Sequence, residues 1–78
     1  MKYDKDSSGN SFLQVPLGWN SPESKVRVSF IQNTRYVRLN KSDAANHIYP
    51  GPEVDIINIP RLIEALAKIY NDHIDEKN

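Results

Sequence analysis

The stretch VRVSFIQNTRYVRLNK, from Val26 to Lys41, decides the fold because it predicts a β-hairpin with two different faces. A turn at residues 33–34 sets a register that pairs Ile31 with Tyr36, Phe30 with Val37, Ser29 with Arg38 and Val28 with Leu39. Strand side chains alternate between the two faces of a sheet. One face therefore carries Val26, Val28, Phe30, Val37 and Leu39, and the other carries Arg27, Ser29, Ile31, Tyr36, Arg38 and Asn40. The apolar face predicts a core, and the basic, aromatic face predicts a binding surface.

The length and composition predict one small domain. The chain has 78 residues and no cysteine, so we expect neither a disulfide framework nor a cysteine-ligated zinc site. The N-terminus lacks the apolar run of a secretory signal, and no segment is long and apolar enough to span a membrane. We therefore expect a cytoplasmic protein.

The charges are balanced overall but unevenly distributed. The chain has 10 basic and 10 acidic side chains, which argues against a surface built entirely for phosphate. Five of the cations and none of the acids lie between Lys25 and Lys41. The rest of the chain is therefore net acidic, and the hairpin is expected to be the basic pole of the molecule.

The segments before the hairpin predict a tail, an edge strand and a loop. Residues 1–10 are polar and are expected to be flexible. Residues 12–17 alternate in hydrophobicity, and Pro16, which cannot donate a ladder hydrogen bond, places this strand at a sheet edge. Trp19 in the following loop either covers the core or acts as an anchor for a partner.

One long amphipathic helix is predicted after the hairpin. Residues 42–49 are either a short helical turn capped by Ser42 or a loop, and residues 54–57 are a short strand candidate. Pro60 suits a first helical turn, with Asn58 as the cap. From about residue 59 to 74, apolar residues recur at spacings of three and four and form one stripe.

These elements predict an α+β domain with two layers. A three- or four-stranded antiparallel sheet, centred on the hairpin at about 26–41, is packed by the C-terminal helix at about 59–74. Residues 11–75 form the domain, and residues 76–78 are a frayed C-terminus.

The sequence offers little for catalysis or metal binding. Asp43 and His47 have the spacing of a metal pair on a helix, but no third ligand is fixed beside them. The acidic residues and His73 within residues 72–76 are better explained as a fraying polar end. No phosphate loop or nucleophile motif is present. We therefore expect no enzyme activity, no catalytic or metal-binding residues and no cofactor.

The exposed hairpin face fits two kinds of partner. The predicted partner-binding residues are Arg27, Ile31, Arg35, Tyr36, Arg38 and Lys41, with Trp19 as a possible anchor. A protein, such as one with an acidic surface, or a second copy of the chain would use the tyrosine and arginines as anchors. A single-stranded nucleic acid would use the cations for phosphate and Tyr36 for base stacking. The zero net charge favours a protein.

Two resemblances bear on this choice. The order of strands followed by a Pro-led helix in DIINIPRLIEAL, together with the basic hairpin, resembles the positive-cofactor-four type of single-stranded-DNA-binding coactivator. That resemblance implies a curved sheet, a dimer, and Arg27, Tyr36 and Arg38 as DNA-binding positions. The size, the polarity and the tract YVRLNKSDAA also look like small accessory proteins of phages and mobile elements, including inhibitors that occlude a host protein.

Overall fold

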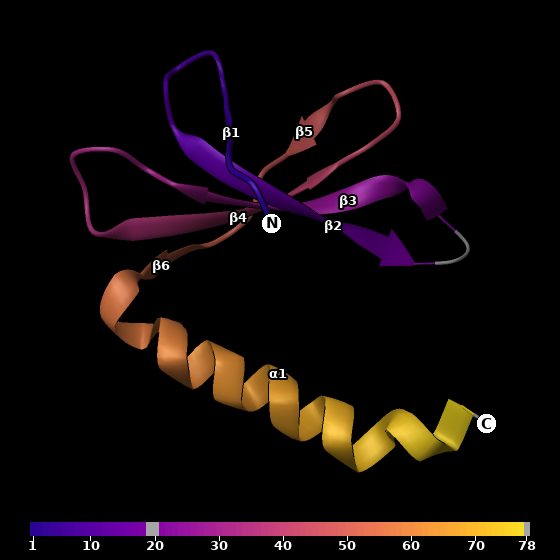
Figure 1. Cartoon of the computed structure of the whole chain (residues 1–78). Helices are drawn as coiled ribbons and strands as arrows, with labels where there is room; N and C mark the ends of the chain where they lie inside the picture. The colour runs from indigo at the N-terminus through magenta and orange to yellow at the C-terminus, as the bar shows by residue number, and fades with distance from the viewer. Residues whose placement is uncertain (19–20, 78) are drawn as a thin grey trace.

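The computed structural model describes residues 1–18 and 21–77, in which six strands form one curled antiparallel sheet followed by a helix (Figure 1). The elements are β1 (Asp4–Lys5), β2 (Ser11–Gly18), β3 (Ser21–Phe30), β4 (Tyr36–Ser42), β5 (Ile48–Tyr49), β6 (Glu53–Asp55), the 3-10 turn η1 (Ile56–Asn58), α1 (Ile59–His73) and the 3-10 turn η2 (Ile74–Lys77). The strand order is β1-β2-β3-β4-β5, and β6 also pairs with β4. Trp19, the possible anchor, lies outside the described residues.

The central hairpin has the register that the sequence predicts. β3 and β4 pair Val28 with Leu39 and Ser29 with Arg38. At the turn, the Ile31 N–H donates to the Tyr36 carbonyl at 3.0 Å. Asn33 has a φ of 66°, a left-handed conformation that asparagine tolerates better than most residues. The alternation of side chains and the turn chemistry therefore agree on one register.

The expected number of three or four strands is wrong, because the sheet has six. β6 corresponds to the strand candidate at residues 54–57, although it ends at Asp55, where η1 follows. β1 and β5, of two residues each, were not expected. β5 and β6 both lie along β4, at opposite ends of it. Between them the chain stays against β4, where the Leu39 N–H donates to the Pro52 carbonyl at 3.0 Å. A Cβ atom at Gly51 would lie 1.8 Å from the Leu39 carbonyl oxygen, so only glycine fits this approach. Strands of two residues, such as β1 and β5, are too short to show a hydrophobic period.

The segment before β2 is also tied to the sheet. β1 pairs with β2 only at Ser11 and Phe12. The Asp6 carboxylate accepts hydrogen bonds from the backbone of Ser8 and Asn10, and the Asn10 side chain accepts from the Gln32 N–H at 3.0 Å. These contacts join the β1–β2 loop to the tip of the central hairpin.

Helix α1 begins where Asn58 and Pro60 predict, although the Asn58 side chain makes no capping hydrogen bond. The expected packing of this helix against the sheet is not formed. α1 buries none of its side chains, and Leu66, in the middle of the apolar stripe, is 60% exposed. Its start is fixed by η1, where the Ile56 N–H donates to the Arg35 carbonyl at 2.7 Å. From there the helix runs along the apolar side of the sheet without packing closely on it (Figure 1).

Burial in this sheet is not confined to the apolar face that its hydrophobic pattern predicts as the core. The buried residues of the described chain are Asn10, Phe12, Ser29, Val37 and Ser42. Phe12 pairs with Ser29, and Ser29 pairs with Arg38, so these positions belong to the polar face. The loops around β1 and β5 rise on the side of the sheet opposite α1 (Figure 1). The polar face is thus partly enclosed, while the apolar face lacks a close cover.

Candidate partner-binding surfaces

Two surfaces of the molecule are candidates for binding, one on each side of the sheet. The first, here called the polar face, consists of Gln14, Arg27, Ser29, Tyr36, Arg38, Asn40 and Glu53. The second, here called the apolar groove, is lined by Val15, Val26, Val28, Val37, Leu39, Ile56, Ile59, Leu62, Ile63 and Leu66. The alternation of side chains in β2, β3 and β4 separates the two surfaces.

Arg27 is held in place on the polar face by its neighbours on β2. Its guanidinium lies 4.0 Å from the centre of the Phe12 ring, a cation–π contact. With the Gln14 amide oxygen turned towards it, Arg27 donates to that oxygen from Nη2 at 3.0 Å and from Nε at 3.1 Å. Arg27 is therefore an ordered part of the sheet surface.

The acidic residues of β6 pair with two of the predicted site arginines. Arg38 donates to Glu53 Oε2 from Nε at 2.9 Å and from Nη2 at 2.7 Å. Arg35 donates to Asp55 Oδ1 at 3.2 Å, and the same carboxylate oxygen accepts from the Ile57 N–H. The hairpin is thus less basic than its own sequence implies, because β6 brings acids to it. Glu53 and Asp55 alternate around Val54, but nothing in the sequence places that strand beside β4.

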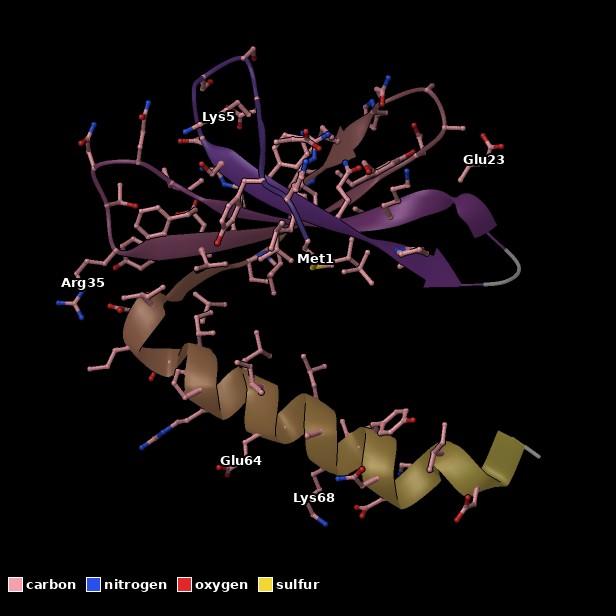
Figure 2. The ribbon with its side chains drawn as sticks, in the orientation of Figure 1. Met1, Lys5, Glu23, Arg35, Glu64 and Lys68 are labelled. Atoms are coloured by element: carbon pink, nitrogen blue, oxygen red, sulfur yellow. The ribbon has the colours of Figure 1, made fainter. Side chains whose placement is uncertain are left out.

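The six predicted partner-binding residues do not all lie together. Arg27, Tyr36 and Arg38 share the polar face, while Ile31 and Arg35 lie at its end, beside the hairpin turn. Figure 2 shows Arg35 at the edge of the molecule, directed outwards. Lys41 pairs with Val26 and Tyr49, and its Nζ lies 5.0 Å from the centre of the Tyr49 ring. Its position in the register places Lys41 on the side opposite Arg38.

Asp43 organises the turn between β4 and β5, where the sequence left a helical turn or a loop open. Asp43 Oδ1 accepts from the N–H groups of Ala45 and His47, each at 3.0 Å, and Oδ2 accepts from the Tyr49 hydroxyl at 3.0 Å. The His47 N–H is the largest of the influences that hold the pKa of Asp43 below its usual value. Its hydrogen bond to Asp43 raises the pKa of the Tyr49 hydroxyl. The Asp43 carboxylate therefore stabilises the turn between β4 and β5.

The described residues contain no group of three or more side chains placed to hold a metal ion. Near the C-terminus, Lys68 donates to Asp72 at 2.9 Å, so one acid of the expected polar end is an ion-pair partner on the helix surface. Among residues 1–18 and 21–77, no helix has the length and hydropathy needed to cross a bilayer.

The apolar groove lies between the sheet and α1 and has a volume of about 600 Å³. Every lining side chain is aliphatic, from β2, β3 and β4 on one side and from η1 and α1 on the other. On the far side of α1, Glu64 and Lys68 point away from the sheet (Figure 2). The helix therefore turns its stripe towards the sheet without contacting it closely.

Comparison of the chain with protein-family models, with curated proteins and with solved structures gave no match. The function is therefore argued from these two surfaces.

Proposed function

We propose that this chain is a small non-enzymatic binding module that docks on a protein partner through the polar face. The observation that carries the proposal is the setting of Tyr36, which is 43% exposed between Arg35 and Arg38 while each arginine is paired with an acid. Tyrosine and arginine are enriched among the residues that dominate protein interfaces.

The ion pairs favour a protein over a nucleic acid. Binding to phosphate gains affinity from each cation that replaces a counterion. Glu53 and Asp55 already neutralise two of the cations that such binding would use. A protein surface can instead meet both signs of charge, because complementary patches on it can pair with acids as well as bases.

The ordering of the surface also supports docking. Arg38 is held by two hydrogen bonds to one carboxylate oxygen, and Arg27 is held between Phe12 and Gln14. Side chains that are fixed before binding lose less conformational entropy when the partner arrives.

The test is a photo-cross-linking experiment in cells that produce the protein. A benzophenone amino acid replaces Tyr36 in one variant. In a matched control it replaces Asn71, which lies on the side of α1 opposite the apolar stripe. We expect Tyr36 alone to yield an adduct that is sensitive to protease and resistant to nuclease. Arg38→Glu should lower the yield of that adduct about tenfold, which corresponds to about 1.4 kcal/mol.

The contrary results are equally definite. An adduct removed by nuclease, or equal adducts at both positions, would exclude the proposal. Titration with single-stranded oligonucleotides at about 50 mM and about 200 mM salt tests nucleic-acid binding independently, because the affinity for phosphate falls steeply over that range. Steeply salt-dependent binding that Arg38→Glu abolishes, but that the matched charge change Arg61→Glu on α1 leaves intact, would assign the polar face to nucleic acid.

A further inference from the structure

The apolar groove is a surface that the proposed function does not use. It lies on the side of the sheet opposite Tyr36 and Arg38, and all of its lining side chains are aliphatic. The apolar surface continues along α1 beyond the groove. Ile69 and Tyr70 are 62% and 61% exposed and lie on the same stripe as Leu66.

The small core of the chain favours an occupant of the groove that is present whenever the chain is folded. Phe12 and Val37 are the only buried hydrophobic residues in the part of the chain that the structure describes. A chain of this length buries little surface in any case, and small domains of this kind commonly gain stability by association. A partner that binds only transiently would leave the apolar groove uncovered for most of the time. A second copy of the chain is always available.

The area of the surface agrees with a dimer. Val15, Leu17, Ile63, Leu66, Ile69 and Tyr70 each leave between 43% and 62% of their surface exposed. At the size of such side chains, these six expose roughly 200–400 Å² of apolar surface. This is a quarter to a half of the roughly 800 Å² per partner of a specific interface, and the remainder would come from the groove walls and a polar rim.

The two halves of the interface are also present on one chain. In each copy the sheet wall of the groove, from β2, β3 and β4, and its helical wall, from α1, face each other without close packing, so each wall lacks a cover. A twofold axis brings the same patch of both copies together, so each supplies what the other lacks. The charged side of α1, with Glu64 and Lys68, then stays in solvent (Figure 2).

We propose that two copies of this chain associate about a twofold axis, with the α1 stripe of each copy packed on the sheet wall of the apolar groove of the other. The polar face remains accessible in this dimer. The two proposals rest on opposite sides of the sheet, so each can fail without the other.

The first test compares two variants of the full chain by sedimentation velocity and by thermal unfolding over a hundredfold range of protein concentration. We expect the unchanged protein to have twice the mass of one chain and a melting temperature that rises with concentration. Leu66→Glu should weaken association at least about a hundredfold. Asn71→Glu, which places the same side chain on the solvated side of the same helix, should leave the mass unchanged. A folded single chain for the unchanged protein, or a dimer that Leu66→Glu leaves intact, would overturn the proposal.

The second test does not depend on a variant that folds. Mixing isotope-labelled and unlabelled copies of the unchanged protein allows magnetisation transfer between chains to be observed separately from transfer within one chain. We expect transfer between chains from the Leu66 methyl groups to those of Val26 and Val28. Transfer only within one chain would show that α1 closes onto its own sheet, and would refute the dimer.

Discussion

At the scale of single residues, Gly51 marks the closest approach of the chain to a neighbouring strand. A side chain at this position would collide with the Leu39 carbonyl, and the loop cannot retreat without losing the hydrogen bond from Leu39 to Pro52. We predict that Gly51→Ala lowers the free energy of unfolding by about 1–3 kcal/mol, the usual cost of overpacking. Urea unfolding measures this change, and an unaltered midpoint would show that the loop can move away freely.

The lowered pKa of Asp43 predicts that the stability of the turn between β4 and β5 depends on pH. Its hydrogen bonds lower the pKa of the folded carboxyl, so its contribution to stability is present above about pH 4 and is lost as the pH falls through the lowered value. We expect NMR titration to place the Asp43 pKa below its usual value. Tyr49→Phe should raise it only part of the way back, because the His47 N–H remains. A full return after Tyr49→Phe would show that the backbone hydrogen bonds contribute nothing.

At the scale of elements, the two phenylalanines distinguish the two sides of the sheet. Phe12 on β2 is 8% exposed beneath Arg27, whereas Phe30 at the end of β3 is 43% exposed. We predict that Phe12→Ala costs about 3–5 kcal/mol of unfolding free energy, the range for a buried phenylalanine. Phe30→Ala should cost less than half as much. Chemical denaturation of the two variants compares them directly, and equal costs would mean that the polar face contains no core.

The elements that were predictable are those long enough to carry a period. β3 and β4 alternate over a stretch that fixes both their register and their turn, and α1 carries a stripe that begins at Pro60. β1 and β5 are too short for any pattern to reveal them, whereas the strand candidate at residues 54–57 predicted β6 but not its neighbour. Their positions depend on backbone pairing with β2 and β4, which leaves no mark on the side chains.

At the scale of the whole molecule, hydrophobicity predicted the faces of the sheet but not which face is enclosed. The apolar face predicts Phe30 in a core, but Phe30 is 43% exposed, whereas Ser29 on the polar face is only 4% exposed. Enclosure depends on the direction in which the sheet curls and on where the loops and the helix lie. Those are long-range properties that alternation along one strand does not contain.

The candidate site was predictable to a similar extent. Arg27, Tyr36 and Arg38 share a face because the hairpin register alone requires it. The acids that modify this face, Glu53 and Asp55, come from a strand whose neighbour the sequence does not reveal. The count of basic residues within the hairpin is therefore correct. It does not describe the charge of the folded surface, because Glu53 and Asp55 pair with two of those residues.

Pro16 has a consequence for how far assembly can proceed. Because β1 covers only Ser11 and Phe12, the remainder of β2 has an outer edge without a neighbouring strand in the described structure. Proline has no N–H to offer along that edge, so an incoming strand cannot form an unbroken ladder there. Growth of the sheet into open-ended fibres is thereby opposed, and a twofold contact through the groove would produce a closed particle.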